Sequence, residues 1–139
     1  MAIFRQLTLA FGAGAFGACI LAIVAFVLAR LGVPERIGAS SPPSDLAFLY
    51  RILVWGGIWG FLFVVPVMNR AWWLKGIIIG LLATLTLVLY FAPPLQQAPT
   101  AALIYIAVLN AFWGLAAGAW WAFVSGPRKN GRKFGTFMR

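Results

Sequence analysis

Four apolar stretches, each long enough to cross a lipid bilayer, follow one another along this 139-residue chain. A transmembrane helix needs about 20 predominantly apolar residues. We therefore predict an all-α integral membrane fold, with four transmembrane helices inside residues 1–124 and a basic tail at residues 125–139. The stretches that we expect to form these helices lie at about residues 7–29, 46–68, 72–92 and 101–124.

The composition argues against an additional soluble domain. Hydrophobic residues make up 63% of the chain and charged residues 9%, whereas a soluble domain carries about 25% charged residues. The four apolar stretches and their connections also occupy nearly the whole length. We expect every folded part of the chain to lie in or against the membrane.

Basic residues are divided unequally between the two ends of the predicted helices. If both termini lie on one side, the opposite side holds only Arg30, Arg36 and Arg51. Cytoplasmic flanks of membrane proteins attract Lys and Arg, so we expect both termini to be cytoplasmic, in a bacterial inner membrane. The side with the termini holds Arg5, Arg70, Lys75, Arg128, Lys129, Arg132, Lys133 and Arg139.

The two halves of the membrane region, about 1–68 and 69–124, resemble each other. Residues 52–60 align with residues 106–114 at one constant offset, and Ile, Val, Trp and Gly recur at matching positions. This alignment predicts a tandem repeat of two helical hairpins. Chance is the alternative explanation, since Gly, Ala, Trp and Leu are frequent in membrane helices.

Small residues spaced four apart occur in every predicted helix. Such pairs leave shallow grooves in which two helix backbones approach closely, and this approach supplies the van der Waals contact that holds helices together in lipid. The pairs either pack the four helices against one another or face a partner subunit or a second copy. The residues concerned are Ala13, Gly17, Gly56, Gly60, Gly76, Gly80, Gly114 and Gly118.

Tryptophans fall into two groups by depth. Three lie well inside the predicted helices, and two of these, Trp59 and Trp113, are equivalent in the two halves. They either fill space opposite glycines or stack on a flat hydrophobic ligand. We expect the other group to anchor the chain at the cytoplasmic membrane interface: Trp72, Trp73, Trp120 and Trp121.

Two polar side chains inside the apolar stretches are candidate ligand or pore contacts, together with Trp59 and Trp113. Arg51 either extends to the lipid headgroups or points inward and contacts an anion. Asn110 either bonds to Thr84 or Thr86 of the third helix or contacts a substrate.

The sequence offers no set of residues for enzyme chemistry. It contains no His and a single cysteine, Cys19, and its only acids, Glu35 and Asp45, lie in a loop where they can pair with Arg36 or Arg51. General acid–base or nucleophilic catalysis needs a positioned group of such residues, and protein metal sites are built mainly from His, Cys and carboxylates. We predict no enzyme activity, no metal and no cofactor.

The tail combines basic and aromatic residues directly after the fourth helix. Lys and Arg bind anionic lipid headgroups, and phenylalanines insert into the membrane interface. We expect the tail to dock on lipid or on a partner subunit, and we expect no nucleic-acid binding. The residues are Arg128, Lys129, Arg132, Lys133, Phe134, Phe137 and Arg139.

Two functions remain open at this stage. The lack of a set of catalytic residues favours a non-catalytic accessory or structural subunit of a larger membrane complex, of the respiratory or photosynthetic type. The alternative is a small channel or carrier that works as a homo-oligomer, with Arg51, Trp59, Asn110 and Trp113 along its path.

Overall fold

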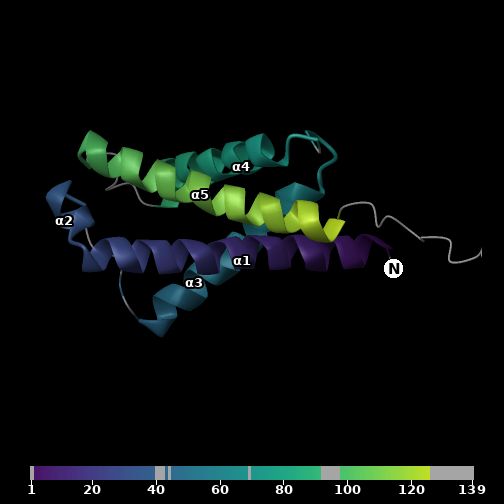
Figure 1. The fold of residues 1–139 in the computed structure, drawn as a ribbon, viewed down its shortest axis with the longest axis horizontal. Coiled ribbons are helices and arrows are strands. Elements are labelled where there is room, and N and C mark those ends of the chain that lie inside the picture. The colour runs from purple at the N-terminus through teal and green to yellow at the C-terminus, as the bar shows by residue number, and fades with distance from the viewer. Residues whose placement is uncertain (1, 40–42, 44, 69, 92–97, 126–139) are drawn as a thin grey trace, which may run out of the picture.

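The computed structural model describes residues 2–39, 43, 45–68, 70–91 and 98–125, which form helices and no β-strand (Figure 1). Four helical segments are long and apolar enough to cross a membrane. The predicted all-α fold with four transmembrane helices is confirmed. In chain order the elements are α1 (Ala2–Arg30), α2 (Val33–Arg36), α3 (Leu46–Gly60), the 3₁₀ helix η1 (Phe61–Val64), α4 (Trp72–Thr86), the π-helix η2 (Leu87–Phe91) and α5 (Thr100–Ser125).

Local signals explain where α1 ends and α3 begins. Gly32 follows α1 with a φ of 67°, in the left-handed region, and its N–H donates to the carbonyl of Ala29. Glycine adopts this conformation without the strain that a side chain would add. Asp45 is the N-cap of α3, where its carboxylate accepts a hydrogen bond of 2.6 Å from the backbone N–H of Phe48.

The second transmembrane segment is shorter than the sequence predicts. Its α-helix ends at Gly60 and continues as the 3₁₀ helix η1, so Pro66 lies beyond the helix and does not kink it. A proline disfavours the helical conformation of the residue before it, and Val65, which precedes Pro66, has an extended ψ of 126°. At this end the Lys75 ammonium of α4 donates hydrogen bonds to the carbonyls of Phe63 (2.8 Å) and Val65 (2.6 Å). These bonds satisfy carbonyls that the end of a helix leaves without partners.

The four long helices form an open row in the order α3, α1, α5, α4. α1 packs against both α3 and α5, and α4 packs against α5, whereas α3 makes little contact with α4. In Figure 1, the start of α3 lies farther from α1 than the end of α3 does. Each half of the chain therefore forms a helical hairpin, and the origin of the two hairpins by duplication stays a prediction.

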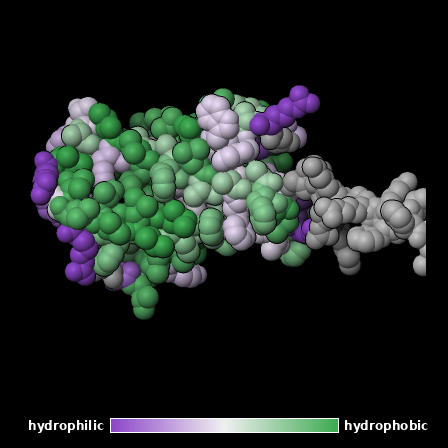
Figure 2. Space-filling view, in the orientation of Figure 1, coloured by the Kyte–Doolittle hydropathy of each residue, from purple (hydrophilic) through white to green (hydrophobic). Residues whose placement is uncertain are grey.

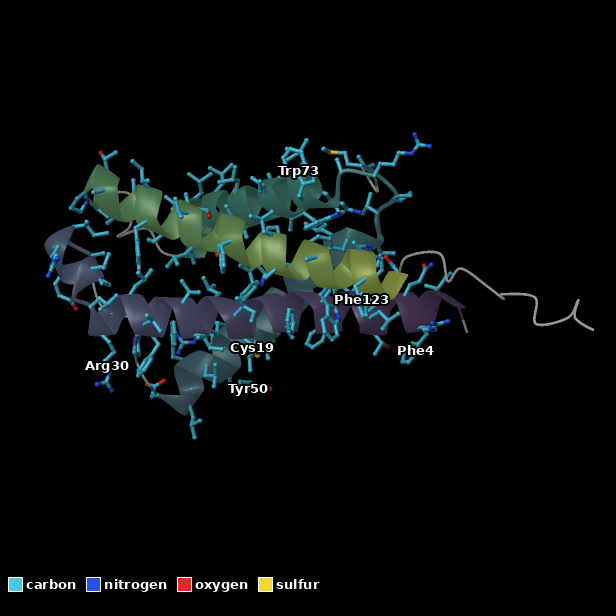
Figure 3. The ribbon with its side chains drawn as sticks, viewed as in Figure 1. Phe4, Cys19, Arg30, Tyr50, Trp73 and Phe123 are labelled. Carbon is cyan, nitrogen blue, oxygen red and sulfur yellow. The ribbon has the colours of Figure 1, made fainter. Side chains whose placement is uncertain are left out.

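The molecule has two distinct ends. The N-terminus and the end of α5 lie at one of them, the terminus end, and α2 and the start of α3 lie at the other, the loop end (Figure 1). Hydrophobic surface covers the middle, and the hydrophilic groups gather at both ends (Figure 2). Large apolar side chains such as Phe4, Tyr50, Trp73 and Phe123 point outward (Figure 3). The chain is a multi-pass membrane protein whose apolar surface faces lipid.

Candidate ligand-binding groove

A cavity of about 630 Å³ lies between the two hairpins. All four long helices line it, and α1 contributes residues only from its second half, at positions 18–25. The cavity therefore extends from the middle of the molecule toward the loop end, in the space that opens where α3 diverges from α4. We call this cavity the groove.

The walls contributed by α3 and α5 are built from equivalent positions in the two halves of the chain. Five α3 residues that line the groove align one for one with five α5 residues that also line it. Their spacing places each set on one helix face. The pairs are Arg51 with Tyr105, Ile52 with Ile106, Trp55 with Leu109, Gly56 with Asn110, and Trp59 with Trp113.

The four candidate ligand contacts from the sequence, Arg51, Trp59, Asn110 and Trp113, all line the groove. They come from two helices that are far apart in the chain. Tyr105 joins them and is missed by sequence reasoning, because a tyrosine in an apolar stretch gives no signal by itself. Extending the alignment of the halves by one residue pairs Tyr105 with Arg51, and this is the signal that could have identified it.

The base of the groove is closed by close packing around Trp113. This residue is only 3% exposed, and its indole N–H donates a 2.9 Å hydrogen bond to the Gly14 carbonyl of α1. A Cβ at Gly56 would lie 2.7 Å from the Ala18 Cβ and 3.1 Å from the Trp113 indole nitrogen. Glycine at position 56 is therefore required for this approach of α3 to α1.

Asn110 is tied to the neighbouring helix. Its amide nitrogen donates a 3.0 Å hydrogen bond to the Thr84 hydroxyl, which confirms one of the two partners expected from the sequence. The Thr86 hydroxyl donates instead to the carbonyl of Leu82 at 2.9 Å. The amide group of Asn110 therefore holds α5 to α4 at the edge of the groove.

Arg51 and Tyr105 line the part of the groove toward the loop end, which we call its mouth. Arg51 is exposed, whereas the Tyr105 hydroxyl is enclosed and has no hydrogen-bond partner among the residues that the structure describes. Each lies about one and a half turns, or roughly 7–8 Å, inside the start of its helix. Both groups therefore lie in the half of their helix that is nearer the loop end.

The small-residue pairs all lie at contacts between helices of this chain. The eight residues predicted for helix packing are buried. A Cβ at Gly76 would meet the Gly114 carbonyl of α5, and a Cβ at Gly60 would meet the Ala10 carbonyl of α1. A Cβ at Gly17 would lie 2.8 Å from the carbonyl oxygen of Trp113. The backbones approach too closely at these points for larger side chains.

Lys75 is the second residue that the sequence does not identify. Its charge alone groups it with the residues that flank the membrane, but its side chain is only 6% exposed. Its bonds to the Phe63 and Val65 carbonyls connect α4 to the end of the first hairpin. A basic residue inside a predicted transmembrane stretch is a signal for such a role.

The chemistry of the groove is that of a binding site. Its described lining contains no His, Cys, Asp or Glu, and Cys19 is exposed on the outer surface of α1 (Figure 3). The predicted docking residues of the tail lie outside the described part of the chain. Ligand sites are typically cavities of about 300–1,000 Å³ that are mainly apolar and aromatic with a few polar groups, and the groove has this character.

Comparison with known proteins adds no assignment to this geometry. No protein family model, no curated protein and no solved structure matches the chain.

Proposed function

We propose that this protein is a non-enzymatic inner-membrane protein that holds one lipid-like amphipathic molecule in the groove. The observation that carries the proposal is the distribution of polarity along the cavity of about 630 Å³. Toward the middle of the molecule its lining includes Trp59 and Trp113 together with Asn110, and toward the loop end it includes Arg51 and Tyr105. A molecule with an apolar chain and a polar head matches that distribution.

The position of the groove supports a ligand from the bilayer. α3 diverges from α4, so the cavity lies between two helices that contact each other little within the membrane region. A lipid can enter such a space sideways without leaving the membrane. The unequal distribution of Lys and Arg favours cytoplasmic termini, so the groove would open toward the opposite leaflet.

A continuous path across the membrane has less support. The groove lies in the loop half of the molecule, and the terminus half contains the buried side chains of Phe63, Lys75 and Ala117. A channel would have to pass through this packed region or form between copies. Uptake and release of one lipid from one leaflet requires neither.

An accessory-subunit role is the second candidate, and the open row of helices favours it. A transmembrane helix of a partner subunit could complete the bundle between α3 and α4. The eight small residues already pack helices of this chain, so a partner would have to use the groove itself or the lipid-facing side chains. A partner helix that used the groove would compete with a lipid for the same space.

Native mass spectrometry of the protein in mild detergent tests the proposal. We expect one lipid to remain bound per chain. Replacing Ala22, which lines the groove, by Trp should lower lipid retention about tenfold, equal to about 1.4 kcal/mol. The matched control is Ile23→Trp on the next residue of α1, which is 60% exposed to lipid and should retain the ligand.

Two results would contradict lipid binding. In the first, the unmodified chain carries no lipid and purifies in a fixed ratio with another membrane protein, and the Ala22→Trp variant no longer purifies with that protein. This result would favour the accessory subunit. The other is equal lipid retention in Ala22→Trp, Ile23→Trp and the unmodified chain, which would place the lipid outside the groove.

A further inference from the structure

We infer that the molecule in the groove carries an anionic phosphate or carboxylate headgroup, bound between Arg51 and Tyr105. This inference rests on the proposed function and specifies its ligand class: an anionic lipid from the leaflet at the loop end. Three features of the groove carry it. They are the charge of Arg51, the enclosed Tyr105 hydroxyl without a partner, and the mainly apolar lining of the rest of the groove.

Arg51 supplies the positive charge. It is the only charged residue that lines the groove within the described part of the chain, and it belongs to the wall formed by α3. A guanidinium group donates several hydrogen bonds in a planar fork that matches phosphate and carboxylate oxygens. A headgroup at the mouth would therefore find its strongest partner here.

Tyr105 supplies an unused donor. Its hydroxyl is enclosed and makes no hydrogen bond to any described residue. A buried polar group without a partner is unfavourable, so a bound acceptor that reaches this hydroxyl is stabilised. For a headgroup oxygen to accept from Tyr105, the side chains that enclose the hydroxyl must move aside, while Arg51 is already exposed to a second oxygen.

Depth and shape agree with this placement. Arg51 and Tyr105 are paired when α3 and α5 are aligned, and each lies five residues from the start of its helix. From there the apolar wall continues past Trp55 and Leu109 to Trp59 and Trp113 at the base. A headgroup at the mouth places its acyl chain along this wall, with the chain directed toward the middle of the membrane.

The acidic groups nearby define the competing outcome. Asp45 is engaged at the N-terminus of α3, where it accepts from the Phe48 N–H. Glu35 in α2 lies close enough to Tyr105 to act on it electrostatically. A lipid with an amine in its headgroup would pair with Glu35, whereas an anionic lipid pairs with Arg51. We favour the anionic lipid because Arg51 lines the groove and Glu35 does not.

The test compares lipids that share acyl chains and differ in headgroup. Purified protein in detergent receives phosphatidic acid, phosphatidylglycerol, phosphatidylethanolamine or phosphatidylcholine, and native mass spectrometry measures the bound fraction. We expect the two anionic lipids to bind about tenfold more tightly than the others. Arg51→Gln should abolish the preference, and Tyr105→Phe should weaken anionic binding about threefold. The matched control is Arg70→Gln, an exposed arginine at the terminus end, which should keep the full preference.

The outcomes separate this inference from the proposed function. Lipid bound without headgroup preference, or with preference for the amine-containing lipid, overturns the anionic headgroup and leaves groove binding intact. No bound lipid at all overturns both. Displacement of lipid by millimolar inorganic phosphate alone would show that the site takes free phosphate, and would also overturn a lipid ligand. If Arg51→Gln does not fold, Arg51→Lys carries the test: it keeps the charge, loses the planar fork, and should retain part of the preference.

Discussion

The two hairpins meet closely along α1 and α5 but remain apart along α3 and α4. On the closed side, the Trp113 indole of α5 donates to the Gly14 carbonyl, and a Cβ at Gly17 would lie 2.8 Å from the Trp113 carbonyl. On the open side the groove separates the helices. In a symmetric pair of hairpins the two sides would be equivalent. The difference between them must therefore come from side chains that differ between the two hairpins.

The difference lies in α1 and α4, the first helices of the two hairpins. α1 carries small residues on two faces: Gly14 and Ala18 approach α3, and Gly17 approaches α5. The glycines of α4, Gly76 and Gly80, both approach α5. Helices in lipid associate where small residues permit close backbone contact. α1 therefore packs two neighbours closely and α4 packs one, which leaves the groove beside α4.

The largest expected effect comes from breaking the closed side with Gly17→Leu. The new side chain would meet the Trp113 carbonyl and the Ala117 Cβ, so α1 and α5 must separate. We expect a loss of about 3 kcal/mol, at the upper end of the usual range for overpacking. Unfolding by increasing SDS in mixed micelles, followed by circular dichroism, measures it.

Gly12→Leu is the matched control for this variant. Gly12 lies on the same helix, and a Cβ there would have no heavy atom within 4 Å. The control should unfold like the unmodified protein. Equal stability of Gly17→Leu and Gly12→Leu would mean that the close approach of α1 and α5 contributes nothing to the fold.

The sequence predicts the transmembrane helices well because their hydropathy depends on local composition alone. It also identifies the groove residues Arg51, Trp59, Asn110 and Trp113, since polar and aromatic groups deep in a membrane segment need partners. The separation of α3 from α4 on the open side cannot be predicted in this way. It depends on which faces of α1 and α4 are small once both helices are packed.

The hydrogen-bond partners of Lys75 and the enclosure of the Tyr105 hydroxyl cannot be predicted from the sequence either, although the position of Lys75 inside a predicted transmembrane stretch is a signal that it has partners. Lys75 lies near the start of its helix, where a basic residue ordinarily indicates a membrane flank. Its burial depends on η1 and the residue that follows it, which present the Phe63 and Val65 carbonyls to the Lys75 ammonium. The state of the Tyr105 hydroxyl likewise depends on neighbours from other helices. Both features are properties of tertiary contact.

Lys75 offers a way to test what limits the width of the open side. Its hydrogen bonds join α4 to η1, the continuation of α3, at the terminus end. Lys75→Met keeps most of the side-chain volume and leaves the Phe63 and Val65 carbonyls without this donor. We expect a loss of about 2–3 kcal/mol, typical of hydrogen bonds to a charged group, and a wider groove.

Stability in mixed micelles and the distance between spin labels on α3 and on η2, the continuation of α4, measure these two effects. The labels occupy cysteines introduced at the exposed residues Ala47 and Leu89 after Cys19→Ser. Arg70→Met, which removes an exposed charge at the same end, is the control. An unchanged label distance in Lys75→Met would show that this residue does not restrain the open side.

The smallest expected effect concerns the position where the two groove walls differ most, Gly56 on α3 and Asn110 on α5. Glycine lets α3 approach α1, whereas Asn110 donates to the Thr84 hydroxyl and holds α5 to α4. Asn110→Ala should cost about 0.6 kcal/mol, the average for interhelical hydrogen bonds in a membrane protein. Thr84→Ala removes the other partner, so the double variant should lose less than the sum of the single losses. If the losses of unfolding free energy are strictly additive, the Asn110–Thr84 hydrogen bond contributes nothing to stability. The contact between α5 and α4 would then depend on the glycine positions alone.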